Sequence, residues 1–169
     1  MKNLLLILLS GLIFIACDNR KEISSINQEN WKNRIIDLPH IDLLIAGTTY
    51  LPVYSQIYGR TEHITHDLTA TISMRNTNRN DTIYIMTATY FNTEGHMIRS
   101  YFDEPIYLAP METVEIIIDE IDQEGGTGAN FLFDWKTETT ACEPLFESVM
   151  ISTSGQQGLS FTTRGVRIK

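Results

Sequence analysis

Hydrophobic and polar residues alternate with a period of two along much of the chain after residue 47. Residues 68–75 alternate apolar side chains with threonine, serine and arginine, and Phe131, Phe133 and Trp135 recur at every second position. Such alternation is typical of β-strands with one buried face. Residues 82–91 are apolar or β-branched at almost every position, which predicts a central strand covered on both faces.

Turn-forming residues separate these expected strands. An Asn-rich run at residues 76–81 ends one strand, and two glycine-rich breaks, at residues 125–128 and 155–158, bracket strands in the last third of the chain. Further strands are expected at residues 48–53, 97–102, 114–118, 129–136, 145–153 and 159–168, with a long acidic loop at residues 119–128. The pattern predicts an all-β fold, a single antiparallel two-sheet sandwich of immunoglobulin-like architecture. A closed barrel is the alternative.

The start of the chain predicts a targeting segment that is not part of the fold. Lys2 is followed by an uncharged apolar run over residues 4–15, shorter than the ~20 residues of a membrane-spanning helix. The run ends in Ile15-Ala16-Cys17, which resembles the lipobox of bacterial lipoproteins. This resemblance implies that residues 1–16 are a lipoprotein signal peptide and that Cys17 becomes a membrane anchor carrying diacylglycerol and a fatty acyl chain such as palmitate. An ordinary secretory signal, with Cys17 as an exported thiol, is the alternative.

Residues 17–45 are predicted to be the lipidated cysteine and a polar tether, followed by one β-sandwich domain over residues 46–169. A helix over residues 28–36 is possible, but Trp31, Ile35 and Ile36 make a thin apolar stripe. We therefore expect the tether to dock weakly or not at all.

Charge and cysteine content restrict the partners. The chain has a net charge of −8, so nucleic acid is not expected to bind. Once Cys17 carries lipid, Cys142 has no partner for a disulfide within the chain. We expect a lipid-anchored protein on the exported side of the cell membrane, periplasmic or extracellular.

Two groups of residues are candidates for a metal site. His63 and His66 lie three positions apart, and the acidic loop contains Asp119 and Asp122. A histidine pair at this spacing suits a helix, whereas a turn is expected here, and the acidic loop does not follow the EF-hand pattern. We therefore expect surface histidines, a solvated acidic loop and no cofactor.

No pattern of residues defines a catalytic centre. There is no Gly-x-Ser-x-Gly turn, and the glycines at residues 125–128 precede an expected strand rather than the helix of a phosphate-binding loop. The prediction is a non-catalytic interaction or binding module rather than an enzyme. The alternative is a metal-ion or small-ligand receptor that uses the His63/His66 turn or the loop at residues 119–124.

Several short blocks resemble one bacterial family. They are Pro52-Val53-Tyr54-Ser55, Arg75-Asn76-Thr77, Gly125-Gly126-Thr127-Gly128-Ala129-Asn130-Phe131, Trp135, Glu143-Pro144, Glu147, Gly155-Gln156-Gln157-Gly158, Ser160-Phe161 and Arg164-Gly165. On these residues the chain from about residue 47 resembles the family catalogued as domain of unknown function thirty-one twenty-four, whose members often carry lipoprotein signals. The resemblance implies an exported single domain and brings no reaction, ligand or catalytic residue with it.

The last two expected strands provide a testable register. If residues 155–158 form the loop of a hairpin, Ser152 lies opposite Phe161 and Met150 opposite Thr163. Phe146, Met150, Leu159 and Phe161 then share the core face.

The opposite face of these strands carries the candidate contact residues. Glu147 and Arg164 lie on it, diagonal to each other, and Gln156 and Gln157 lie at its rim. The favoured interpretation is a simple surface ion pair between Glu147 and Arg164. The alternative is that this polar face is the contact surface for the envelope protein that we expect as the partner.

Overall fold

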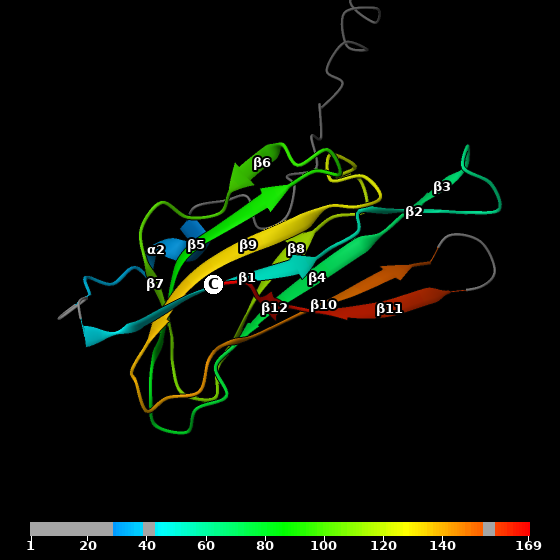
Figure 1. Ribbon diagram of the computed structural model, residues 1–169. Coiled ribbons are helices and arrows are strands. Elements are labelled where there is room, and N and C mark those ends of the chain that lie inside the picture. The colour runs from blue at the N-terminus through cyan, green and yellow to red at the C-terminus, as the bar shows by residue number, and fades with distance from the viewer. Residues whose placement is uncertain (1–28, 39–42, 154–157) are drawn as a thin grey trace, which may run out of the picture.

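The computed structural model of the protein consists mainly of two antiparallel β-sheets packed together (Figure 1). The structure describes residues 29–38, 43–153 and 158–169, so the predicted signal peptide, Cys17, Gln156 and Gln157 lie outside the described residues. The elements in chain order are α2 (Glu29–Lys32), β1 (Ile45–Pro52), β2 (Gln56–Tyr58), β3 (Thr65–Asp67), β4 (Thr69–Arg75), β5 (Ile83–Phe91), β6 (Met97–Ser100), β7 (Ile106–Leu108), β8 (Thr113–Ile118), β9 (Asn130–Thr137), β10 (Leu145–Ser152), β11 (Leu159–Arg164) and β12 (Val166–Arg167).

The larger sheet has six strands in the order β12-β1-β9-β5-β6, with β7 also paired to β5. The smaller sheet has the order β11-β10-β4-β8, and β2 and β3 form a separate hairpin that projects from one end of the sandwich (Figure 1). The all-β prediction is confirmed, and the strands form two sheets rather than one closed barrel.

Alternating side chains fill the space between the two sheets, as the sequence predicts. Phe131, Phe133 and Trp135 all point from β9 into the core and are buried. Phe131 stacks on Phe133 at 5.4 Å between ring centroids, and Phe133 stacks on Phe146 of β10 at 4.2 Å. Because β9 and β10 belong to different sheets, this row of rings joins the layers, and each aromatic pair adds about 0.5–1.5 kcal/mol beyond the area that it buries.

Strand β5 is central in the larger sheet but is not fully covered on both faces. Its inward residues are buried, whereas its outward residues are half-buried. The β-branched residues on both faces of β5 therefore reflect its central position in the sheet. They do not mean that other elements fully cover its outer face.

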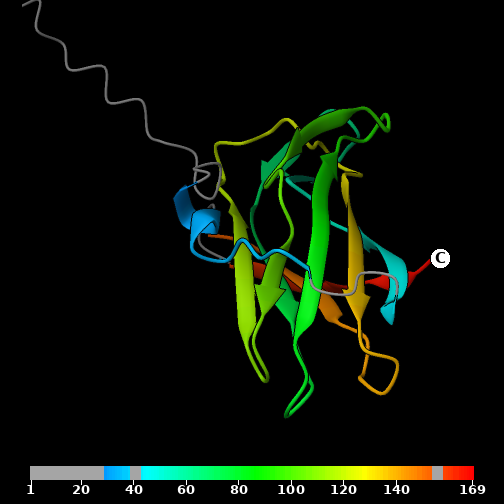
Figure 2. The same ribbon diagram turned by 90° about the vertical axis from the view of Figure 1, so that its left-hand side faces the viewer.

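The N-terminal segment departs from the expected tether. Trp31 is buried, with 4% of its surface exposed, and its ring centroid lies 5.4 Å from that of Phe102. The backbone of residues 34–36 also bonds to that of residues 105–107, through N–H groups of Ile36 and Tyr107 at 3.0 and 3.1 Å from their acceptors. In Figure 2 this segment runs from α2, at the left of the view, across the front of the strands. The expectation of weak docking or none is thus wrong for residues 31–36, because one buried indole and backbone pairing outweigh a thin apolar stripe.

The register of the last hairpin also departs from expectation. Ser152 pairs with Leu159 and Met150 with Phe161, so the connection spans residues 153–158 and the expected pairing is off by two positions. An even shift keeps every side chain on its expected face. Phe146 and Met150 are accordingly buried, and Phe161 is half-buried. Leu159 is 39% exposed because β11 is an edge strand.

None of the helices in the described part of the chain combines the length and apolarity that crossing a membrane requires.

Candidate functional site

The glycines at residues 125–128 pack the chain against the larger sheet. A side chain at Gly125 would place its Cβ 1.9 Å from the hydroxyl oxygen of Tyr90, and Gly126 has a φ of 72°, which favours glycine. The carbonyl of Gly126 accepts the backbone N–H of Ser55 at 3.2 Å. We call this region the glycine corner; packing and turn geometry explain its glycines.

The acidic loop is anchored by an arginine from β6. Arg99 Nη1 lies 2.7 Å from Asp122 Oδ2, and Arg99 Nη2 lies 2.7 Å from Glu124 Oε2. Asp122 is buried, so the expectation of a fully solvated loop is wrong at this residue. Burial is the largest single effect and would lower the pKa of Arg99, but the ion pairs with Asp122 and Glu124 and the nearby Tyr101 together outweigh it and raise that pKa above its ordinary value.

The metal candidates do not come together. His63 is exposed beside Glu62, with 3.5 Å between Nε2 and Oε1, and His66 lies in β3 opposite Ile57. Asp122 is already bound to Arg99. Throughout residues 29–38, 43–153 and 158–169, no three histidine, cysteine, aspartate or glutamate side chains lie close enough to hold a metal ion.

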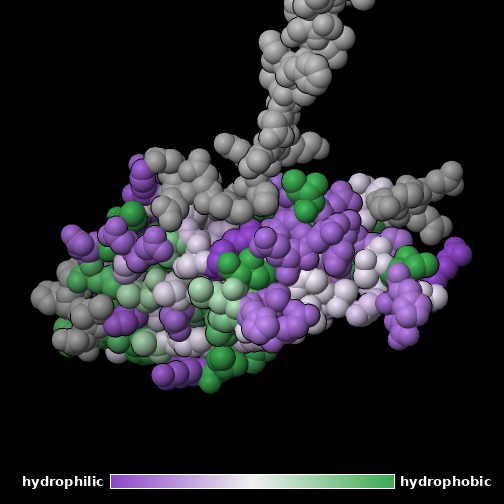
Figure 3. Space-filling model, turned by 90° about the horizontal axis from the view of Figure 1, so that it is seen from above, coloured by the Kyte–Doolittle hydropathy of each residue, from purple (hydrophilic) through white to green (hydrophobic). Residues whose placement is uncertain are grey.

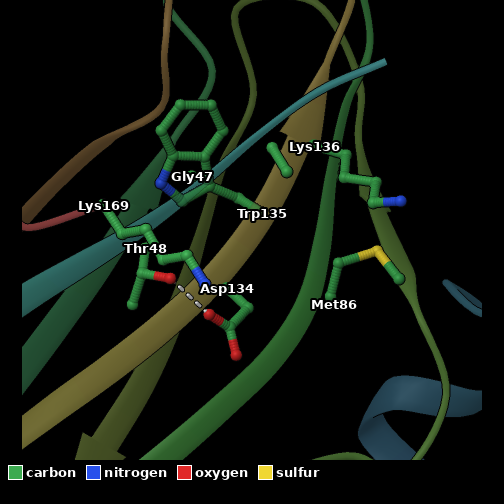
Figure 4. Close-up of a pocket in the computed structure, with 8 residues that line it drawn as sticks. Gly47, Thr48, Met86, Asp134, Trp135, Lys136 and Lys169 are labelled. Carbon is green, nitrogen blue, oxygen red and sulfur yellow. Dashed lines mark hydrogen bonds between the residues drawn. The ribbon is translucent and has the colours of Figure 1, made fainter. Parts of the chain in front are cut away.

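A hollow of about 240 Å³ lies over β1, β9 and β5, lined in part by Met86, Lys136 and Lys169 (Figure 4). At its floor, Asp134 accepts hydrogen bonds from Thr48 at 2.7 Å and from Thr87 at 3.0 Å. Each carboxylate oxygen is thus bonded to a hydroxyl from a neighbouring strand. This arrangement ties three strands together.

At the end of β11 the chain crosses from the smaller sheet to the larger one. Arg164 ends β11, and after Gly165 the chain continues as β12, which pairs with β1. A Cβ at Gly165 would lie 2.7 Å from Cγ2 of Thr49 and 3.1 Å from Cβ of Phe146. The Gly165 N–H also donates to the Phe146 carbonyl at 2.8 Å. Glycine is required here because the backbone passes between side chains of the two sheets.

Charged side chains gather around this crossing, and we call them the arginine corner: Arg75, Glu143, Glu147, Arg164 and Arg167. Arg75 Nε lies 3.3 Å from Glu147 Oε2. Arg167 pairs with Glu143, and its guanidinium lies 5.2 Å from the ring centroid of Trp135. Arg164 makes no ion pair or side-chain hydrogen bond within the described part of the chain. Three guanidinium groups therefore meet two carboxylates, and the group left over is that of Arg164.

A hollow of about 290 Å³ opens beside Arg164. Its polar lining comes from both sheets and from the loops that join them: Thr49, Thr77, Glu143, Arg164 and Arg167. In Figure 1 these loops gather at the end of the sandwich away from the β2–β3 hairpin. The face in Figure 3 shows hydrophobic side chains interspersed with hydrophilic ones.

Comparison with known proteins identifies the family. The model of the family described as Protein of unknown function (DUF3124) matches residues 46–168. The chain belongs to this family. Among solved structures, the DUF3124 domain is similar to the one titled "Crystal Structure of Thermotoga maritima 1070", with 11% sequence identity and a TM-score of 0.46, covering 71% of this chain and 92% of that chain. No curated protein matches the chain.

In the DUF3124 domain, Glu147 and Arg164 lie directly opposite each other on β10 and β11, rather than diagonally. Glu147 pairs with Arg75 and not with Arg164, so the favoured expectation of a surface ion pair between Glu147 and Arg164 is wrong. The sequence did not point to Arg75 or Arg167 as members of the same site. Gly165 is the sequence signal that could have indicated Arg167, because this glycine marks the crossing between the sheets that brings Arg167 beside the other charges.

Proposed function

We propose that the protein is an exported lipoprotein, anchored to the membrane through Cys17, whose DUF3124 domain is a non-catalytic binding module of the cell envelope. Its partner in this proposal is another envelope protein, which contacts the arginine corner. The lipobox-like end of the apolar run supports the anchor. Several acyl chains on one cysteine hold a protein firmly, whereas one chain alone binds marginally.

The unpaired guanidinium of Arg164 is the observation that carries the proposal. The chain is acidic overall, and nearby carboxylates at Glu143 and Glu147 are already paired with other arginines. An exposed, unpaired guanidinium beside a polar hollow offers up to five hydrogen-bond donors at a fixed geometry. Arginine is also enriched among the residues that contribute most to protein interfaces. Contact with a partner would give this charge the counterion that the domain does not supply.

The chemistry of the corner favours binding over catalysis. Its charged side chains are arginines and glutamates held in ion pairs, and the described residues place no nucleophile beside a general base there. Such a site can orient and neutralise a partner's charges without reacting with them.

We also propose that the sandwich belongs to the immunoglobulin-like kind. The support is that every strand pair among the described residues is antiparallel and that non-consecutive strands pair in both sheets, β1 with β9 and β4 with β10. This architecture commonly presents loops and sheet edges to partner proteins.

Crosslinking in intact cells tests the contact surface. Arg164→Glu in the full chain should abolish crosslinking to the partner, while the melting temperature stays nearly unchanged because surface substitutions usually change stability by under about 0.5 kcal/mol. Arg60→Glu is the matched control, since Arg60 is also an exposed arginine and lies in the β2–β3 hairpin at the other end. Crosslinking that survives Arg164→Glu, or a collapse of stability, would refute the assignment.

Fatty-acid labelling tests the anchor separately. The parent chain should incorporate labelled palmitate, and Cys17→Ser should lose the label and leave the membrane fraction. Label that persists in Cys17→Ser would show that the lipid is attached elsewhere.

A further inference from the structure

The charges of the arginine corner define the ligand more closely than the proposed function does. Arg75 is neutralised by Glu147 and Arg167 by Glu143, which leaves the single positive charge of Arg164 beside the hollow. We infer that this hollow binds one carboxylate group of an acidic peptide segment, with the Arg164 guanidinium as its counterion. The inference rests on the proposed binding function and names the chemistry of the partner.

A carboxylate fits this charge balance better than a phosphate does. Phosphate esters carry about 1.5 to 2 negative charges near neutral pH, so a phosphate would exceed the single charge of Arg164 and approach Glu143 and Glu147. A carboxylate carries one charge and accepts two parallel hydrogen bonds from a guanidinium. The site is therefore matched to a monoanion.

A second donor lies at the same hollow. Thr49 is almost fully buried, and its hydroxyl oxygen accepts the indole N–H of Trp135 at 3.0 Å. The hydroxyl proton of Thr49 has no acceptor in the described part of the chain. A buried donor without an acceptor costs free energy, and a carboxylate oxygen in the hollow would satisfy it. Thr77, which is exposed, adds a further hydroxyl at the rim.

The size of the hollow indicates a side chain or a chain end as the occupant. Its volume of about 290 Å³ lies at the lower limit of small-molecule pockets, which measure about 300–1,000 Å³. An aspartate, a glutamate or a terminal carboxylate of a partner would fit with its backbone outside. The remaining affinity would then come from contacts of the peptide with the surrounding strands.

Peptide binding to the full chain in detergent tests the inference. The probe is a rhodamine-labelled, amidated peptide of alternating serine and glutamate, followed by fluorescence anisotropy, and a peptide with glutamine in place of glutamate is the reference. The glutamate peptide should bind about tenfold to a hundredfold more tightly, the range expected for a hydrogen-bonded charged group. Arg164→Gln should remove this difference, Arg164→Lys should retain part of it, and Arg60→Gln should leave it unchanged. Acetate should displace the peptide at lower concentrations than inorganic phosphate.

Three results would overturn the inference. They are equal binding of the two peptides, unchanged binding by Arg164→Gln, and displacement by phosphate at lower concentrations than acetate. If the glutamate peptide binds no more tightly than the glutamine peptide while Arg164→Glu still abolishes crosslinking in cells, the carboxylate assignment is wrong and the proposed function stands. If the glutamate peptide binds through Arg164 while crosslinking survives Arg164→Glu, the carboxylate site is real and the proposed partner surface lies elsewhere.

Discussion

Replacing Trp31 with alanine should destabilise the domain strongly, although Trp31 lies before the first strand. Its side chain is 4% exposed and packs on Phe102 at 5.4 Å between centroids. A buried tryptophan contributes about 150–250 Å² of area. At about 25 cal/mol per Å² this corresponds to about 4–6 kcal/mol as an upper estimate, and measured Phe or Trp to Ala changes cost about 3–5 kcal/mol.

Urea unfolding and thermal melting measure this loss. For a domain of this size a change of 1 kcal/mol shifts the melting temperature by about 2–4 °C, so Trp31→Ala should lower it by about 6–20 °C. Far-ultraviolet circular dichroism reports the sheets, and fluorescence of Trp135 reports the core, because the chain has 2 tryptophans and the other one is removed.

Two control variants separate packing from other effects. Leu43→Ala changes a side chain that is 71% exposed in the same segment and should alter stability by under about 0.5 kcal/mol. Trp31→Phe should cost less than Trp31→Ala, since the indole N–H is buried without a hydrogen-bond partner among the described residues and phenylalanine keeps an aromatic ring. A loss below about 0.5 kcal/mol for Trp31→Ala would show that the segment is a tether after all.

Three further predictions address the interior and the crossing. Asp122→Ala should lower the free energy of unfolding, measured by chemical denaturation, by about 3 kcal/mol, because Arg99 is then largely buried without its main counterion. Glu124→Gln is the control: this carboxylate is exposed, so its loss should cost under about 1 kcal/mol. Gly165→Ala should destabilise the domain by about 1–3 kcal/mol through overpacking; a melting temperature equal to that of the parent would contradict the role of the crossing. Burial raises the pKa of the Tyr101 phenol above its ordinary value. The neutral phenol therefore stabilises the fold fully below about pH 10, and this stabilisation is lost as the pH rises through the higher pKa of the folded state. Tyr101→Phe should flatten the alkaline loss of melting temperature, and an unchanged pH profile would exclude Tyr101 as its source.

The alternation of the strands made the fold predictable. The buried face of β9 follows directly from the aromatic residues at every second position, because a side chain on a strand alternates faces whatever its neighbours are. The same rule kept Glu147 and Arg164 on their expected face even though the hairpin register was wrong by two positions. The register depends on which residue pair is the last one before the turn. The glycines at residues 155 and 158 did not show that this pair is Ser152 and Leu159.

Contacts between distant segments were not predictable from spacing. Trp31 belongs to a polar stretch, and only the position of Phe102 in three dimensions makes it a core residue. Asp122 likewise resembles its exposed neighbours in sequence, but Arg99 approaches from another strand and buries it in an ion pair. Local pattern fixes which face a residue occupies, whereas long-range pairing decides whether a partner reaches it.

The adjacent residues Arg164 and Gly165 show how structural and functional roles separate at the arginine corner. Every part of Gly165 is explained by packing, since its missing side chain makes room for Thr49 and Phe146 and its N–H closes a backbone hydrogen bond. The side chain of Arg164 is explained by no contact within the described part of the chain, although Glu147 lies directly across from it. Because Glu147 is paired with Arg75 instead, Arg164 is exposed and has no counterion among the residues that the structure describes. Folding alone gives no reason for this arrangement, whereas the anionic partner that we propose would give one.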